Sequence, residues 1–118
     1  MQGALEKQVK GGIKLSIKID GYEFTDPEKF ADWTPPNKAG VYAILANNTK
    51  IYIGQSGNLS DRGFFRNHHR YNCWIRQAGG SEDKLYISVH LMPDSTGSDR
   101  KKIESELINK LDPICNKE

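Results

Sequence analysis

The chain has 118 residues, which is enough for one domain with a single modest hydrophobic core. Hydrophobic residues make up 36% of it, and no apolar stretch approaches the roughly 20 residues of a membrane span, so we expect a soluble protein and exclude a membrane-spanning helix. Seventeen Lys and Arg against fifteen Asp and Glu give a net charge of +2, which by itself indicates no particular partner.

The N-terminal residues and the cysteines predict an intracellular, cytoplasmic protein. Residues 1–10 are polar and charged, and no hydrophobic segment follows them, so a signal peptide is not expected. Cys73 and Cys115 are too few for a disulfide framework and lie far apart in the sequence. We therefore expect two free thiols, as in a reducing compartment.

The first predicted element is a β-hairpin over residues 13–24. Isoleucine and leucine alternate with polar residues from Ile13 to Ile19, and Asp20-Gly21 precedes a second β-rich segment that ends at Phe24. Asp26-Pro27 then predicts a short helix through Trp33, because aspartate caps helices and proline suits the first helical turn.

A second hairpin is predicted from two β-rich segments, Gly40 to Leu45 and Lys50 to Gly54. The core face would hold Val41, Ala43, Leu45, Ile51 and Ile53. Tyr42 and Tyr52 would then emerge together on the other face, because side chains alternate along a strand. A two-residue loop would break that register, so we predict a loop with an odd number of residues, such as Asn47 to Thr49.

The second half of the chain alternates helices and a strand. The remaining predicted elements are a helical region that begins at Leu59 and is shortened by Gly63, a helix over Arg70–Gln77, a strand over Leu85–Met92, and a helix over Arg100–Leu111 capped by Ser98 or Asp99. Apolar and polar residues alternate along the predicted strand, which makes it the third strand of the central sheet.

Residues 61–80 carry four arginines against one acid, a local net charge of +3. Histidine, phenylalanine, tyrosine and tryptophan side chains are interleaved with them. Such a segment can hold phosphates and stack on bases. It is equally typical of a solvated helix with an aromatic packing face, and both interpretations stay open.

Glu104 lies on the apolar arc of the last predicted helix. At 100° per residue this arc also holds Ile103, Leu107, Ile108 and Leu111, whereas Glu106 falls well outside it. A carboxylate that faces inward is costly unless a cation or hydrogen-bond donors satisfy it. The candidates are a metal ion or an arginine such as Arg62, and the second would be a purely structural ion pair.

Together these segments resemble the GIY-YIG nuclease domain family. The residues that carry the resemblance are Gly40-Val41-Tyr42, Tyr52-Ile53-Gly54, Leu59, Arg62, Glu104 with Leu107-Ile108, and Pro113 to Asn116. It covers roughly Pro36 to Asn116, so residues 1–35 are expected to be an N-terminal extension with the hairpin and short helix, and residues 36–118 the nuclease-like domain. The resemblance implies an α+β fold with a small three-stranded, largely antiparallel sheet flanked by helices, to which the N-terminal β-hairpin is an appendage.

The resemblance also implies a DNA endonuclease that uses one divalent cation, Mg²⁺ or Mn²⁺. Glu104 would be the metal ligand, Tyr42 the general base, Tyr52 a positioning group, and Arg62 the cation that stabilises the phosphorane. Gly40, Gly54 and Asn116 would support the site structurally. Strand tyrosines are also common on sheet surfaces, which is the alternative for Tyr42 and Tyr52.

Two positions depart from the family pattern, because Arg66 and Gln55 stand where relatives often have a helper for the base. His69 is the candidate substitute, although two surface histidines would serve no catalytic purpose. Contacts to nucleic acid are expected from Arg66, His68, Arg70, Arg76 and Gln55. A competing zinc site would use His68, His69, Cys73, His90 and Cys115, but there is no Cys-x-x-Cys pair to nucleate it.

Two functions follow from this sequence, a metal-dependent endonuclease and a module of the same fold that binds nucleic acid without cutting it. Relatives serve in repair, mobile introns, restriction and structure-selective cutting, so the resemblance does not name a target. Because little lies outside the nuclease-like domain, we expect weak specificity, a partner protein or self-association.

Overall fold

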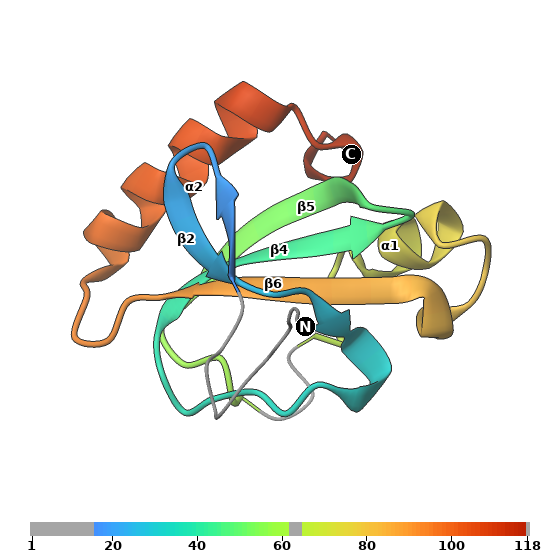
Figure 1. The fold of residues 1–118 in the computed structure, drawn as a ribbon, viewed down its shortest axis with the longest axis horizontal. Helices are drawn as coiled ribbons and strands as arrows, with labels where there is room; N and C mark the ends of the chain where they lie inside the picture. Colours follow the sequence, from blue (N-terminus) through green and yellow to red (C-terminus); the bar gives the residue numbers. More distant parts are fainter. Residues whose placement is uncertain (1–15, 62–64, 118) are drawn as a thin grey trace, which may run out of the picture.

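A four-stranded antiparallel sheet forms the centre of the molecule (Figure 1). The computed structural model describes residues 16–61 and 65–117. Within them the sheet consists of β3 (Glu28–Lys29), β4 (Gly40–Ala46), β5 (Thr49–Ser56) and β6 (Leu85–Leu91), in the spatial order β3-β6-β4-β5. The α+β class is as predicted, but the sheet has a fourth strand that the sequence did not indicate.

The extra strand arises where a helix was expected. Glu28 and Lys29 pair with Ile87 and Tyr86 of β6, and only a single 3-10 turn, η1 (Phe30–Asp32), follows. Pairing with β6 gives these residues backbone partners that a short isolated helix would lack. The helix predicted from Asp26-Pro27 is therefore wrong.

The N-terminal hairpin is confirmed in the described residues, as β1 (Ser16–Ile19) and β2 (Tyr22–Thr25). Residues 13–15 of the predicted hairpin lie outside them. The turn is Asp20-Gly21, with φ of 50° and 88°, which suits the twist of a two-residue hairpin loop. Figure 1 shows the hairpin beside α2, and Ile19 and Phe24 are buried in the same cluster as Val41.

The connection between β4 and β5 corrects our loop prediction. It has two residues, Asn47 and Asn48, both with positive φ (53° and 65°). The register shifts instead inside the hairpin, because Ile44 pairs with Tyr52 while Leu45 pairs with Lys50, which leaves Ile51 as a bulge. Ile51 consequently packs on the opposite face from the one we predicted, with the tyrosines.

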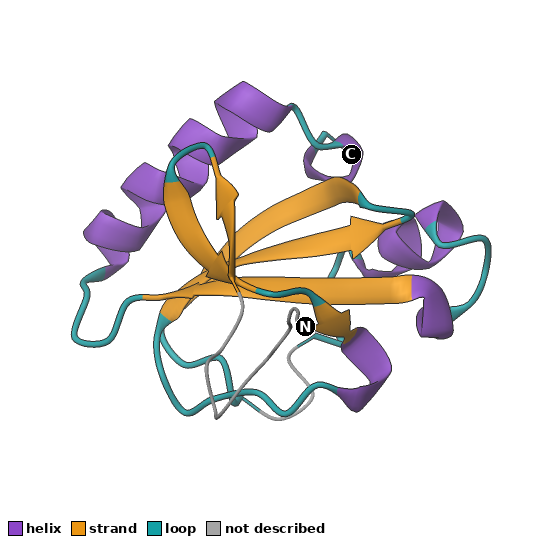
Figure 2. Ribbon diagram, in the orientation of Figure 1, coloured by secondary structure: helices purple, strands orange, loops and turns teal. Residues whose placement is uncertain are grey.

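Among the described residues, two α-helices flank the sheet (Figure 2). The first, α1 (Tyr71–Gln77), agrees with the prediction. The second, α2 (Gly97–Leu111), begins earlier than predicted, because Thr96 is the cap and forms a reciprocal capping box with Asp99. Leu59 lies in a turn, and no helix is assigned from there to residue 61. Short 3-10 turns, η2 (Glu82–Lys84) and η3 (Ile114–Asn116), complete the described elements.

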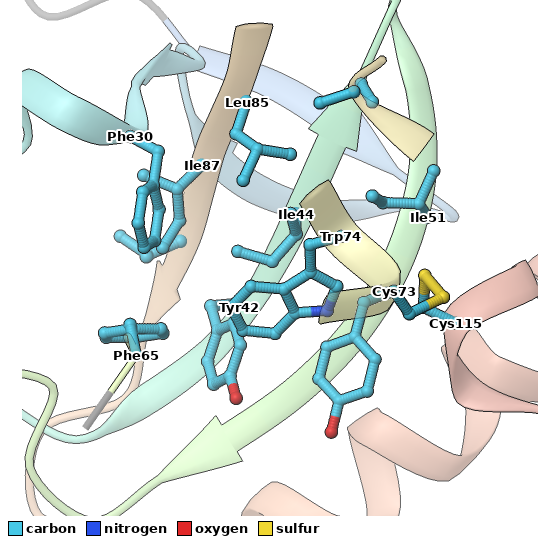
Figure 3. Packing of buried hydrophobic residues seen from close by; sticks show 14 of the residues in the cluster. Phe30, Tyr42, Ile44, Ile51, Phe65, Cys73, Trp74, Leu85, Ile87 and Cys115 are labelled. Carbon is cyan, nitrogen blue, oxygen red and sulfur yellow. A yellow bond between two sulfur atoms is a disulfide. The ribbon is translucent and has the colours of Figure 1, made fainter. Parts of the chain in front are cut away.

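Each face of the sheet has its own core. One cluster, shown in Figure 3, packs Tyr42, Ile44 and the side chains of α1 into an aromatic-rich layer. The other packs Val41, Ala43 and the hairpin against α2. Because β4 is buried on both faces, Tyr42 lies in the core and not on a solvent-facing surface of the sheet.

Cys73 and Cys115 form a disulfide, so the expectation of two free thiols is wrong. The bond joins α1 to η3, and both residues are buried (Figure 3). Their separation of 42 residues gave no hint that the fold places the two Cα atoms 5.8 Å apart. Across the described ranges, no helix is both long and apolar enough to cross a membrane.

Candidate active site

Tyr42 and Tyr52 meet on the face of the sheet that carries α1. Tyr42 lies opposite Gly54 and Tyr52 opposite Ile44, so the two tyrosines are diagonal neighbours on adjacent strands. Their ring centroids are 6.1 Å apart. They share a face as predicted, but only 1% of Tyr42 and 8% of Tyr52 is exposed, so they are not surface tyrosines.

The glycines beside the tyrosines are required by close contacts. A β-carbon at Gly54 would lie 2.5 Å from both Cζ and Oη of Tyr42 and 2.9 Å from the Tyr52 ring. A β-carbon at Gly40 would lie 2.6 Å from the carbonyl oxygen of His90. Neither glycine has a positive φ, so space rather than backbone conformation is the reason for both.

Burial governs the acidity of the two phenols. It raises the pKa of Tyr42 far above its ordinary value of 10.0, and the charges of Tyr52 and Glu104 raise it further. A hydrogen bond between the two phenols also raises the pKa of Tyr42 and lowers that of Tyr52. Burial raises the pKa of Tyr52 as well, so both phenols are neutral at pH 7.

Glu104 of α2 lies within electrostatic reach of both tyrosines, since its charge raises the pKa of each. The carboxyl group is half-buried, and burial raises its own pKa, with Lys101 opposing the shift. No hydrogen bond or ion pair to this carboxylate is formed by the residues that the structure describes. Glu106, in contrast, is exposed and accepts a hydrogen bond of 2.5 Å from the Tyr22 hydroxyl, as expected for its place off the apolar arc.

Asn116 holds the strand between the two motif residues Tyr52 and Gly54. Its side-chain nitrogen donates to the carbonyl oxygen of Ile53, and its side-chain oxygen accepts from the amide of Ile53, both at 2.9 Å. Ile53 needs such a partner because β5 is an edge strand. The disulfide at Cys115 fixes the neighbouring residue and with it the position of this amide.

The histidines lie close to Tyr52, but His68 rather than His69 makes the contact. The centroids of the His68 and Tyr52 rings are 5.1 Å apart, and His69 stacks on the outer side of His68 at 4.6 Å. Burial, with His69 and Arg70 adding to it, lowers the pKa of His68 to about 4. Its Nδ1 accepts from the backbone amide of Arg70 at 3.0 Å, so the neutral ring carries its proton on Nε2.

The cations of the basic segment have different surroundings. Arg66 forms a two-pronged ion pair with Glu82, at 2.9 and 2.8 Å, which also accepts from the Tyr71 hydroxyl at 2.6 Å. Arg70 lowers the pKa of Tyr52 and so lies near it. Arg76 is exposed on α1. Arg62, expected to stabilise the phosphorane, lies outside the described residues.

Gln55, which follows the second tyrosine motif, is held by an arginine that sequence reasoning missed. Arg100 of α2 donates from Nε to Oε1 of Gln55 at 2.8 Å. It stands four residues before Glu104, and this i, i+4 spacing on one helix face was a signal in the sequence that could have drawn attention to it.

A hydrated divalent cation fits these residues better than zinc does. No group of three histidine, cysteine or acidic side chains able to hold a metal ion occurs among the described residues, and the two cysteines are bonded to each other. Glu104 offers one unpartnered carboxylate instead. A single carboxylate is a typical protein contribution to Mg²⁺, which keeps several waters and takes substrate phosphates as its other ligands.

Comparisons of the sequence with known proteins find no match, whereas the comparison with solved structures does. No family model matches the chain. No curated protein matches it. Among solved structures, a tyrosine-to-phenylalanine mutant of the GIY-YIG N-terminal endonuclease domain of UvrC from Thermotoga maritima, bound to its catalytic divalent cation, aligns with a TM-score of 0.50 and 25% identity over 69% of this chain and 84% of that chain.

A second tyrosine-to-phenylalanine mutant of the same domain aligns over the same shares, with a TM-score of 0.50 and 23% identity. This chain has the GIY-YIG nuclease-domain fold. Within the GIY-YIG fold, Gly40 to Tyr42 stand on the central strand β4 and Tyr52 to Gly54 on the edge strand β5. Glu104 approaches from α2, so the GIY-YIG residues converge on the β5 edge from three elements.

Proposed function

We propose that this protein is a metal-dependent DNA endonuclease that hydrolyses phosphodiester bonds. The observation that carries the proposal is Glu104, a half-buried carboxylate beside Tyr42 and Tyr52 to which no described residue donates a hydrogen bond or pairs as a cation. A protein does not usually keep such a group without a ligand for it.

In this proposal Glu104 holds one Mg²⁺ or Mn²⁺ ion. When bound, the ion would supply charge neutralisation for the phosphate that is attacked. Burial raises the pKa of the carboxyl group, so protons compete with the cation at a higher pH than they would at an ordinary glutamate. Cation affinity should accordingly fall as the pH is lowered.

The tyrosines would move a proton rather than act as a phenolate. The two hydroxyl groups are hydrogen-bonded to each other, and a phenol oxygen can also accept from a water molecule. Tyr42 would take the proton of the attacking water while its own hydroxyl proton passes to Tyr52 and the original hydroxyl proton of Tyr52 leaves to solvent. Arg70, which lowers the pKa of Tyr52, favours that last loss of a proton.

The remaining roles follow the sequence. Arg62 would stabilise charge on the phosphorane, for which a guanidinium is well suited. Arg70, Arg76 and Gln55 would contact the nucleic acid. His68, whose ring lies against Tyr52, would position that tyrosine. It would take the place of His69, from which a proton transfer was expected. For Arg66, the ion pair with Glu82 supports an indirect role, because its charge is already engaged.

One observation favours the second function, a module that binds DNA without cutting it. Burial is the largest cause of the raised pKa of Tyr42, and a phenol that stays neutral at pH 7 is a weak general base. A single experiment distinguishes the nuclease from the binding module.

The test is incubation of plasmid, linear duplex and branched DNA with Mg²⁺ or Mn²⁺. We expect cleavage that stops when the cation is chelated, that falls by about 10²-fold to 10⁴-fold in Tyr42→Phe, and that drops to background in Glu104→Gln and Arg62→Ala. Glu106→Gln is the matched control, because it changes an exposed acid two residues away on α2 and keeps an acceptor for Tyr22.

Absence of cleavage by the wild type on all three substrates, with DNA binding retained, would establish the binding module instead. Cleavage that survives Glu104→Gln would sink the assignment of the site. We also propose that the protein acts where cellular DNA is, inside the cell, with a partner protein or self-association providing the target.

A further inference from the structure

Arg100 is the arginine that joins the start of α2 to the end of β5. Its Nε donates to Oε1 of Gln55 at 2.8 Å, and its Nη1 donates to the carbonyl oxygen and Oγ of Ser95, at 2.8 and 2.9 Å. These three acceptors are all neutral. The guanidinium is thereby held in one orientation, partly buried between two elements of the candidate site.

The charge of Arg100 has no acidic partner. Over residues 16–61 and 65–117, no carboxylate lies within ion-pairing distance of it. Asp99 precedes it, and the charge of Arg100 helps to lower the pKa of that carboxyl group, but the carboxylate accepts from the amide of Thr96 and forms no ion pair with Arg100. Lys101, rather than Arg100, is the cation that lowers the pKa of Glu104. A partly buried, fixed cation without an ion-pair partner is the kind of group that an anionic ligand satisfies.

The third nitrogen of the guanidinium is the one that is open. Nη2 makes no hydrogen bond with the described residues and lies over two glycines. It is 3.3 Å from the position of a β-carbon on Gly57 and 3.8 Å from that on Gly97. A side chain at Gly57 would crowd this nitrogen, whereas one at Gly97 would only touch it. Gly57 is exposed, so Nη2 lies beside a part of the chain that solvent reaches.

Arg100 and Glu104 mark two points along one direction. They are one helical turn apart on the same face of α2, about 6 Å along its axis. Glu104 acts on Tyr52, whereas Arg100 reaches Gln55, three residues further along β5. Arg100 therefore lies further along the edge strand β5 than Glu104 does, on the side away from the tyrosines.

We propose that Arg100 binds a backbone phosphate of the DNA strand that is cut, next to the scissile phosphate and not the scissile phosphate itself. The inference rests on the proposed function and names a phosphate subsite that extends it. Since Nε and Nη1 are fixed by protein acceptors, Nη2 can donate to a phosphate oxygen without loss of those bonds. The subsite would set how the strand lies across the tyrosines.

The test measures duplex DNA binding by the non-cleaving Glu104→Gln protein at several salt concentrations. Adding Arg100→Met should weaken binding about tenfold and make the slope of log K against log[salt] less negative by about 0.9, the contribution of one phosphate contact. Lys102→Met, which removes an exposed charge from the same helix, is the control and should change the slope by less.

A neutral methylphosphonate placed at one linkage at a time then locates the contact. One position beside the cut should weaken binding when Arg100 is present and have no further effect in Arg100→Met. If circular dichroism shows that Arg100→Met does not fold, Arg100→Lys replaces it in the same scan. In Arg100→Lys, the neutral linkage at that one position should weaken binding less than it does when Arg100 is present.

The outcomes separate this subsite from the nuclease proposal. A wild type that cleaves DNA, with an unchanged salt slope in Arg100→Met, or with no linkage whose effect depends on Arg100, overturns the subsite alone. A protein that binds with the expected slope change but never cleaves supports a phosphate contact by Arg100 and overturns both the nuclease and the placement of that phosphate beside a scissile one. Failure of the Glu104→Gln protein to bind any DNA overturns the subsite as well.

Discussion

At the scale of single residues, the two tyrosine motifs fit each other sterically. The phenol of Tyr42 lies over Gly54, so the first motif fills the space that the second leaves open. Phe65 also packs on this ring, with its centroid 4.9 Å from that of Tyr42. The phenol of Tyr42 is therefore held by contacts with both Gly54 and Phe65.

His68 gives a prediction about pH. Its pKa is about 4 in the folded protein, against 6.5 for an unperturbed imidazole, because the ring is partly buried beside His69 and Arg70. Between these two pH values the unfolded chain binds more protons than the folded one, so the free energy of unfolding should fall as the pH is lowered from about 6.5 to about 4. Urea unfolding at a series of pH values measures this slope.

The matched variants are His68→Gln and His69→Gln. The first should flatten the pH dependence in this window, and the second should leave most of it, because His69 lies on the outer side of the stack. An unchanged slope in His68→Gln would show that some other group causes the acid sensitivity.

At the scale of elements, the edge strand β5 depends on a side chain in place of a neighbouring strand. Asn116→Ala removes both hydrogen bonds to the backbone of Ile53, and we expect a loss of about 1–2 kcal/mol in the free energy of unfolding. Faster hydrogen exchange of the Ile53 amide should accompany it. Asn116→Asp keeps the acceptor and should protect that amide better than alanine does.

Lys117→Ala is the control for this pair, because the next side chain is exposed and forms an ion pair with Asp112. Equal exchange of the Ile53 amide in Asn116→Ala and in the wild type would mean that the side-chain bonds do not protect the strand. If Asn116→Ala also slows DNA cleavage, the strand geometry at Tyr52 is the link between the two effects.

The β4–β5 hairpin shows which part of this fold the sequence could predict. Alternation placed Tyr42 and Tyr52 on one face, and this was right. The loop was wrong because the same parity can be met in two ways, by an odd loop or by a two-residue loop with a bulge at Ile51. The local sequence pattern constrains only the total number of residues in the loop and the bulge. The packing of Ile51 into the aromatic core decides how that number is divided.

The same limit applies to the site. The helical period of α2 identified Glu104 as inward-facing, because that inference needs only one element. Arg100 was missed because its importance depends on Gln55 and Ser95, which are contacts between elements. The strand at Glu28 and Lys29 was missed for a related reason, since it exists only through its pairing with β6.

At the scale of the whole molecule, the disulfide joins the C-terminal turn η3, which follows α2, to α1 on the other face of the sheet. It closes a loop between residues 42 apart in sequence, and loop-closure entropy makes such a bond worth about 4 kcal/mol. We expect the double variant Cys73→Ser, Cys115→Ser to lose about that much stability in urea unfolding. Oxidised and reduced wild-type protein should differ in the same direction.

The control is the pair of single variants, each of which should resemble the reduced wild type. Mass spectrometry of alkylated native protein should find no reactive thiol. Two alkylated cysteines in the native protein, with unchanged stability in the double variant, would contradict the bond. Because reducing compartments keep most thiols free, the same measurement on protein isolated from its own cells indicates where it resides.

The amide of Asn116 has a further consequence for how copies of this protein behave toward one another. An eight-residue strand with open backbone groups is a template on which another chain can add a strand. Here the chain's own C-terminal turn occupies the middle of that template, at Ile53. The side chain that holds the strand at Tyr52 therefore also blocks the pairing of β5 with another chain. A single mutation of Asn116 should both disturb the candidate site and promote aggregation.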